Sequence, residues 1–122
     1  MPDSAAFEKL VAEVLDDLPP RFAAYLQNVE VIVEPRITRE TCQRCGLRPG
    51  EVVYGLYEGV PMTRRGSGHA PLPATITIFY EPLERHCASR AELRREVRRT
   101  VLHELAHHFG ISDERLEELG AY

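Results

Sequence analysis

Residues 103–113 read HELAHHFGISD, which is the pattern H-E-x-x-H-x-x-G-x-x-D. In a helix, residues four apart lie one turn apart on the same face, so His103 and His107 can both face one metal ion. Glu104 is rotated by about 100° around the helix from His103 and can reach a water molecule held by that metal. His108 is rotated by about 100° from His107, so we expect it to contact a neighbour or solvent instead of the same ion.

The residues after this helix offer a third metal ligand. Gly110 lies where the helix is expected to end, because the left-handed conformation costs glycine little. A turn there can bring Asp113 back beside the two histidines, and two imidazoles, one carboxylate and an open position are typical of catalytic zinc. Asp113 can instead act only as the N-cap of a following helix. Rival third ligands are the carboxylates of Glu114, Glu117 and Glu118.

The motif predicts chemistry as well as metal binding. A zinc ion of this kind lowers the pKa of its bound water toward about 7. Glu104 is then expected to accept the proton as the water attacks a carbonyl, and to deliver that proton to the leaving amine. The alternative interpretation makes His103 and His107 ordinary half-buried helix residues and Glu104 a solvated one. The helical context and the glycine favour the metal interpretation.

Length and composition indicate one domain, residues 1–122, large enough for a single modest core. The net charge of −4 does not favour nucleic acid as a partner. No apolar stretch approaches the roughly 20 residues that cross a bilayer, so we expect no membrane association. The N-terminus lacks the basic and then apolar pattern of a secretion signal, and we therefore expect a cytoplasmic protein.

Hydrophobic periodicity predicts an α+β domain in which a small mixed sheet packs against helices, with the metal-binding helix near the C-terminus. Helices are expected from Ser4 to the prolines at 19–20, briefly after Pro20, from a Ser89 cap to about Phe109, and over 112–119. Strands are expected over 29–34, 51–57 and 74–80. Residues 35–50 are expected to be irregular and 59–73 to form a long loop. The helix after Ser89 carries an apolar stripe at Leu93, Val97, Val101, Leu105 and Phe109.

The stretch HELAHHFGISDERL, residues 103–116, resembles the minimal zincins, a family of zincin-like metallopeptidases. The upstream stretch GLYEGVP, residues 55–61, is also similar to that family. The resemblance implies a compact zincin-like fold with zinc bound by His103, His107 and Asp113, and Glu104 as the catalytic base. It also implies a metallopeptidase whose substrates are peptides or flexible protein segments.

Two other functions are compatible with the motif. One is a zincin-fold, metal-dependent endoribonuclease, which the cluster of arginines at 90–99 favours and Glu104 and Asp113 disfavour. The other is a metal-binding regulatory module with little activity, against which Glu104 argues, because metal binding alone does not require it. The arginines have a plainer explanation, a solvated face with Glu92–Arg95 and Glu96–Arg99 ion pairs.

Several other residues are candidates for substrate contacts or for a second metal site. Residues 75–80 are a candidate edge strand for holding an extended peptide, or else an ordinary internal strand. A phenol that stabilises an oxyanion can come from Tyr54, Tyr57, Tyr80 or Tyr122. A second, structural zinc ion is possible at Cys42 and Cys45, completed by His86 and Cys87. A Cys42–Cys45 disulfide or reduced thiols are the alternatives.

Overall fold

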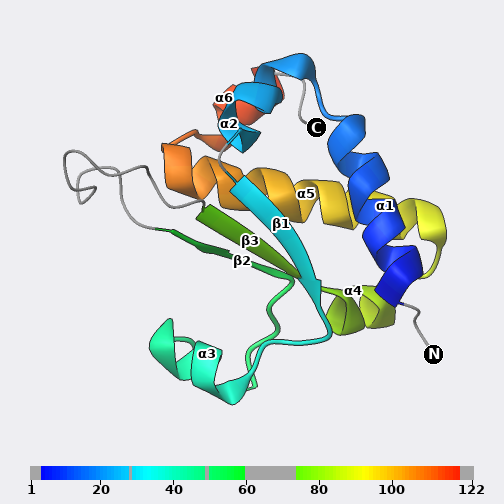
Figure 1. Ribbon diagram of the computed structural model, residues 1–122, viewed down its shortest axis with the longest axis vertical. Coiled ribbons are helices and arrows are strands. Elements are labelled where there is room, and N and C mark those ends of the chain that lie inside the picture. The colour runs from blue at the N-terminus through cyan, green and yellow to red at the C-terminus, as the bar shows by residue number, and fades with distance from the viewer. Residues whose placement is uncertain (1–3, 28, 49, 60–73, 119–122) are drawn as a thin grey trace.

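The computed structural model describes residues 4–27, 29–48, 50–59 and 74–118. A three-stranded mixed sheet packs against helices (Figure 1), which confirms the predicted α+β class. The strands are β1 (Val29–Glu34), β2 (Gly55–Glu58) and β3 (Ala74–Phe79). The helical segments are α1 (Ser4–Asp16), η1 (Pro20–Phe22), α2 (Ala23–Leu26), α3 (Arg39–Arg44), α4 (Tyr80–His86), α5 (Arg90–Phe109) and α6 (Asp113–Glu118).

The strand order is β1-β3-β2, with β1 parallel and β2 antiparallel to β3. The central strand β3 is also the most buried, and Ile76 and Ile78 have no exposed surface. This pattern is expected when both sides of a strand are paired and one face meets the core. The interpretation of residues 75–80 as an edge strand is therefore wrong, because β1 and β2 flank this segment on both sides.

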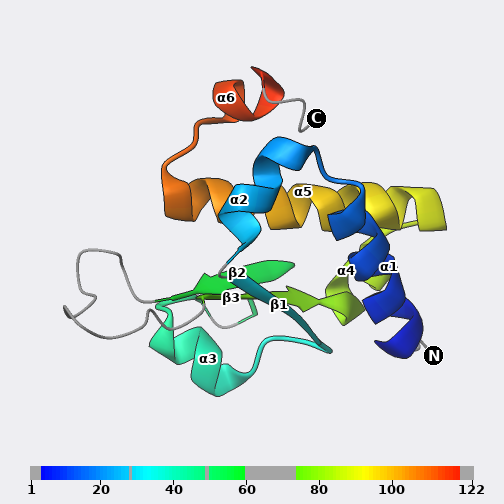
Figure 2. The same ribbon diagram turned by 45° about the horizontal axis from the view of Figure 1, so that its top comes forward.

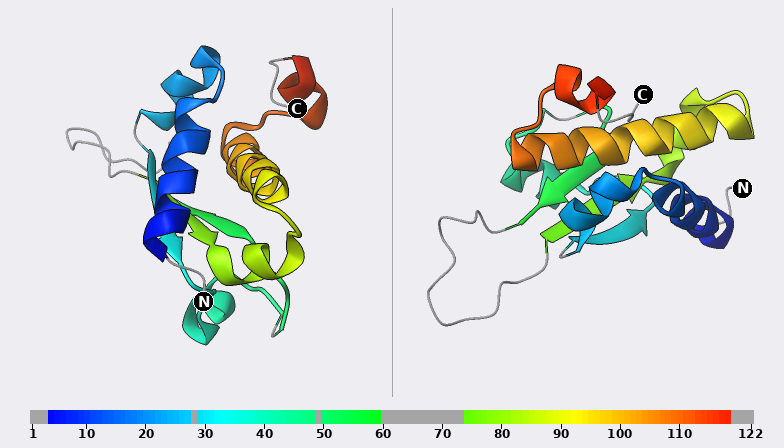
Figure 3. Two further views of the ribbon diagram at one scale, coloured as in Figure 1. Left: turned by 90° about the vertical axis from the view of Figure 1, so that its right-hand side faces the viewer. Right: turned by 90° about the horizontal axis from the view of Figure 1, so that it is seen from above.

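Helices α1 and α5 lie side by side over one face of the sheet (Figure 3), and α3 lies on the other side (Figure 2). The core between the helices and the sheet is mainly aliphatic, as expected for the apolar stripe of α5. Its fully buried members include Leu10, Phe22, Ile76, Ile78, Leu83, Val97, Val101, Leu102, Leu105 and Leu116. The expected stripe on α5 departs from the sequence prediction at its end, where Phe109 is 40% exposed and packs against Tyr25.

The ends of α5 follow from local sequence chemistry. Ser89 is the N-cap and accepts a hydrogen bond from the Glu92 amide at 3.1 Å, as predicted. At the other end Gly110 has φ +67°, and the amides of Gly110 and Ile111 both donate to the Ala106 carbonyl. This is a Schellman-type stop that turns the chain toward α6. No helix within the described ranges is long and apolar enough to cross a membrane.

The sequence did not predict two of the described helices, α3 and α4. Within the segment expected to be irregular, Thr38 caps α3 by accepting from the Thr41 amide at 3.1 Å. Helix α4 begins at Tyr80, directly after β3, and carries Pro82 in its first turn, where proline is tolerated. The second strand is also shifted, to Gly55–Glu58 from the expected 51–57. A strand requires a partner, and β3 ends at Phe79, opposite Tyr54.

Gly55 allows α5 to approach β2 closely. A Cβ atom placed on Gly55 would lie 2.5 Å from Thr100 Cγ2, well inside van der Waals contact, and 3.4 Å from the Thr77 carbonyl oxygen. Thr100 cannot easily rotate away, because its hydroxyl donates to the Glu96 carbonyl at 2.7 Å. The glycine at this position therefore sets the spacing between α5 and the sheet edge.

We expect Gly55→Ala to lower the free energy of unfolding by about 1–3 kcal/mol, because the added methyl group overpacks the helix–strand contact. The second change Thr100→Ser removes Cγ2 and keeps the hydroxyl, so it should restore most of that loss in the double variant. Urea denaturation of the four proteins in this cycle measures the coupling. Additive losses in the double variant would contradict the proposed contact.

Gly110 gives a separate prediction. A Cβ at this position meets no atom within 4 Å, so replacement costs only backbone strain at positive φ. Gly110→Ala should lower the free energy of unfolding by about 1 kcal/mol, and Gly110→Asn by less, because asparagine tolerates the left-handed region. Equal losses for the two variants, measured by urea denaturation, would show that strain at this position does not control stability.

Candidate metal centre

The two histidines of the motif lie on consecutive turns near the end of α5. His103 is half-buried, whereas the side chain of His107 is 86% exposed. Residues four apart in an α-helix are separated by about 5.4 Å along the axis and share one face. The helix therefore presents one imidazole close to the protein body and a second one at the surface, as the sequence pattern predicts.

Glu104 lies between the helix and the sheet edge. Its side chain is only 17% exposed, and its carboxylate is 3.9 Å from His107 Nδ1. Burial raises the pKa of the Glu104 carboxyl, while the nearby His107 and a hydrogen bond with the backbone of Tyr57 act in the opposite direction. The carboxylate is thus held beside the histidines by a backbone group of β2.

Among the described strands, β2 forms the edge of the sheet next to Glu104. The Phe79 amide donates to the Tyr54 carbonyl at 2.9 Å, so Tyr54 and Phe79 form a hydrogen-bonded pair across β2 and β3. Pairing alternates in antiparallel strands, and Gly55 and Tyr57 consequently direct their backbone groups away from β3. The Tyr57 amide points out of the sheet, toward the position where Glu104 contacts it.

The third ligand predicted from the sequence is only partly described. Asp113 is the first residue of α6, and its side chain lies outside the described residues, as does that of His108. The N-cap of α6 is Ser112, whose hydroxyl accepts from the Arg115 amide at 3.1 Å. The capping interpretation of Asp113 therefore fails, because the preceding residue has that role.

The rival carboxylates lie on exposed positions of α6. Glu114, Glu117 and Glu118 are all exposed, and Glu118 pairs with Arg115 at 2.9 Å. Among the residues that the structure describes, no group of three or more His, Cys, Asp or Glu side chains is placed to hold a metal ion. A set completed by one of these glutamates is therefore not assembled, and Asp113 stays the predicted third ligand.

The proposed second zinc site does not assemble. Cys42, Cys45 and Cys87 are free thiols, which also excludes the Cys42–Cys45 disulfide in this structure. The Cys42 thiol points to the backbone carbonyls of Leu47 and Arg48, at 3.6 and 3.5 Å. His86 instead forms a short hydrogen bond with the Tyr54 hydroxyl. These four candidate ligands, all of them in the described part of the chain, do not come together as a group that could hold a metal ion.

The candidate phenols are separated by the fold. Tyr54 contacts His86, and Tyr80 packs on Phe7 with ring centroids 5.7 Å apart. Tyr57 is the one next to Glu104, but its hydroxyl lies toward Gly59, where an added Cβ would be 2.8 Å from it. Tyr122 lies outside the described residues. These contacts therefore do not support an oxyanion role for Tyr54, Tyr57 or Tyr80.

One arginine of α5, Arg94, forms ion pairs with another part of the chain. Arg94 bridges to α1 through Glu13 at 3.1 Å and Asp17 at 3.0 Å. The expected pairs of Glu92 with Arg95 and of Glu96 with Arg99 do not form among the described side chains. Glu92 instead accepts a hydrogen bond from the Ala88 amide. Arg94 thus links α5 to α1.

Comparison with known proteins agrees with this architecture. A model of the zincin-like metallopeptidase family matches residues 26–121. A solved structure described as a conserved hypothetical protein from Thermo thermophilus is similar in fold, with a TM-score of 0.58 and 24% sequence identity over 88% of this chain and 94% of that chain. No curated protein matches the chain. The family match covers the sheet, α5 and α6, and the chain belongs to the zincin-like metallopeptidase family.

Proposed function

We propose that the protein is a zinc-dependent peptidase that hydrolyses peptide bonds with Glu104 as general base. The observation that carries this proposal is the position of Glu104, which is largely buried beside His107 and hydrogen-bonded to β2, the edge strand among those described. A solvated helix glutamate would have neither property. Membership of the zincin-like metallopeptidase family supports a peptide substrate.

The donor set fits zinc. His103 and His107 would supply two imidazole nitrogens from one helix face, and Asp113 would supply a carboxylate, a combination that leaves a position open for chemistry. When bound, the ion supplies Lewis acidity, which polarises a carbonyl group and makes a nearby water molecule more acidic. The partly buried His103 would also hold its ring in a fixed orientation.

Strand β2 offers a surface for an extended peptide. Gly55 directs its backbone groups outward, and an added strand can pair with such groups without reading the peptide sequence. A peptide bound there would pass beside Glu104, because the Glu104 carboxyl contacts the Tyr57 backbone. This strand replaces residues 75–80 as the proposed peptide-binding segment.

Glu104 would transfer a proton during hydrolysis. Its carboxylate would accept a proton from the attacking water and deliver it to the leaving amine, which is the general acid–base role. Burial favours this role, since the low-polarity surroundings strengthen the tendency of the carboxyl to take up a proton. The hydrogen bond from Tyr57 holds the group in place and prevents it from turning into solvent.

Metal content tests the ligands. His103→Ala and His107→Ala should each reduce bound zinc from near one equivalent to a small fraction, because two ligands cannot hold the ion tightly. Asp113→Ala should weaken zinc binding, whereas the matched change Glu117→Ala on the same helix should not. Zinc is measured by elemental analysis after dialysis. A loss with Glu117→Ala and not with Asp113→Ala would make Glu117 the third ligand in place of Asp113.

The rate of peptide hydrolysis tests whether Glu104 is the general base. Glu104→Gln keeps the size of the side chain and should leave zinc bound while lowering peptide hydrolysis by about 10²-fold or more. The control Glu114→Gln makes the same change at an exposed position on α6 and should leave the rate unaltered. Rates are measured with a library of unfolded peptides after zinc loading. Full turnover by the Glu104→Gln variant would remove this residue from the mechanism.

The substrate class is tested with the same loaded protein. Peptide cleavage that zinc restores after chelation supports the peptidase. Cleavage of RNA without cleavage of peptides would instead support the endoribonuclease. Bound zinc with neither activity would leave a metal-binding module.

A further inference from the structure

A cavity of about 630 Å³ opens on the side of the sheet away from α5, between α3, the segment from Leu47 to Val53 and α4. Its volume falls in the range of small-molecule sites, which is about 300–1,000 Å³. None of the motif residues His103, Glu104 and His107 lines it. It is therefore separate from the candidate metal centre, and nothing in the proposed peptidase reaction uses it.

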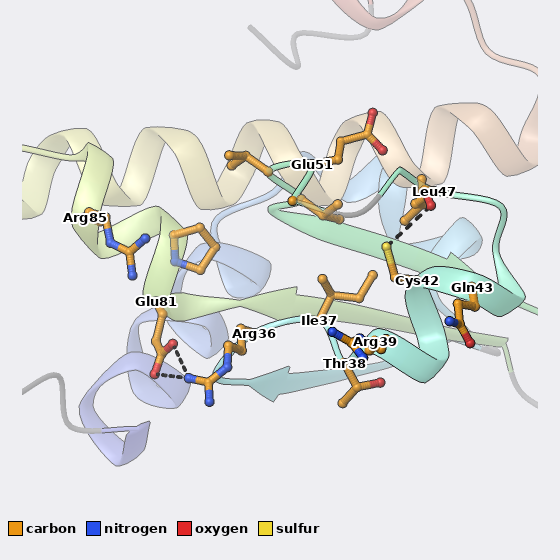
Figure 4. A pocket seen from close by; sticks show the side chains of 14 residues that line it. Arg36, Ile37, Thr38, Arg39, Cys42, Gln43, Leu47, Glu51, Glu81 and Arg85 are labelled. Carbon is orange, nitrogen blue, oxygen red and sulfur yellow. Dashed lines mark hydrogen bonds and ion pairs between the residues drawn. The ribbon is translucent and has the colours of Figure 1, made fainter.

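The wall of the cavity is aliphatic over much of its area. Ile37, Leu47, Val52 and Val53 line it, and Val52 is 57% exposed, which is unusual for a large hydrophobic residue in this chain. Figure 4 shows Ile37 in the middle of the opening, with Leu47 and Cys42 at the end next to α3. Apolar side chains left open to solvent around a cavity favour an apolar occupant.

The charged side chains at the cavity are mainly cationic. Arg36, Arg39 and Arg85 line it together with Glu81 and Glu51. Glu81 is used by Arg36, which donates to both of its carboxylate oxygens at 3.0 and 3.3 Å. The Glu51 carboxylate points away from the other labelled side chains (Figure 4). Arg39 and Arg85 form no ion pair or hydrogen bond with any residue that the structure describes.

We propose that this cavity binds a small aliphatic carboxylate. The carboxylate would pair with Arg85, because a guanidinium matches it with two parallel hydrogen bonds. The aliphatic part would lie along Ile37, Val52 and Val53 toward Leu47. The proposal does not depend on the metal centre, since no residue is shared between the two sites.

Octanoate is the probe for the native protein. It should bind saturably in calorimetry, and octan-1-ol and octylamine should bind at least about tenfold more weakly, because they lack the charge that the arginines pair with. Equal binding of octylamine would overturn the assignment of an anion site. A leucine-terminated peptide that binds through its free carboxylate, while octanoate does not, would also overturn it in favour of a chain terminus.

Variants locate the site. Arg85→Gln should weaken octanoate binding by about tenfold, the usual loss for a charge-assisted hydrogen bond. Arg39→Gln, which changes an arginine nearer α3, should weaken it less. Both residues are exposed, so neither change threatens the fold. Arg99→Gln is the matched control, because Arg99 is exposed on α5 and does not line the cavity. Unchanged affinity in both cavity variants would overturn the proposal.

The cysteines provide a readout that is independent of affinity. Cys42 lines the cavity, whereas Cys45 and Cys87 do not. Saturating octanoate should slow alkylation of Cys42 by N-ethylmaleimide several-fold and leave Cys45 and Cys87 unaffected, as followed by peptide mass spectrometry. Equal protection of all three thiols, or of none, would contradict binding in this cavity.

Discussion

The close approach of α5 to the edge strand β2 positions the candidate metal centre. Gly55 permits it, because any side chain there would collide with Thr100. One turn further along α5, Glu104 meets the backbone of Tyr57. The helix that carries both histidines is thus fixed against β2, which lies at the edge of the sheet formed by the described strands. A wider spacing would separate the carboxylate from the edge where a peptide can bind.

The rest of the core supports this contact. The buried side of α5 packs on Ile76 and Ile78 of the central strand, and Arg94 ties the helix to α1 through Glu13 and Asp17. Beyond Gly110, α6 returns to the core through Leu116, which is fully buried. Each of these contacts restricts α5 from a different side, so the histidines are held on a rigid element.

The two faces of the sheet carry different chemistry. The face under α5 and α1 is buried and mainly aliphatic, and the metal motif lies where α5 leaves the core. On the other side, α3 is joined to the edge strand by the Arg44–Glu58 ion pair and leaves the arginine-lined cavity open. The candidate metal centre and the cavity thereby lie apart in a small domain.

Local sequence patterns determined helix α5, from its Ser89 cap to the left-handed Gly110, because capping and periodicity act within a few residues. They also indicated the central strand and the histidine spacing. The edge position of β2 was decided by tertiary structure, because strand limits depend on partners distant in sequence. Helices α3 and α4 also appeared only in the tertiary structure. The same holds for the Glu104–Tyr57 contact and the cavity, which join segments that the chain brings together only when it folds.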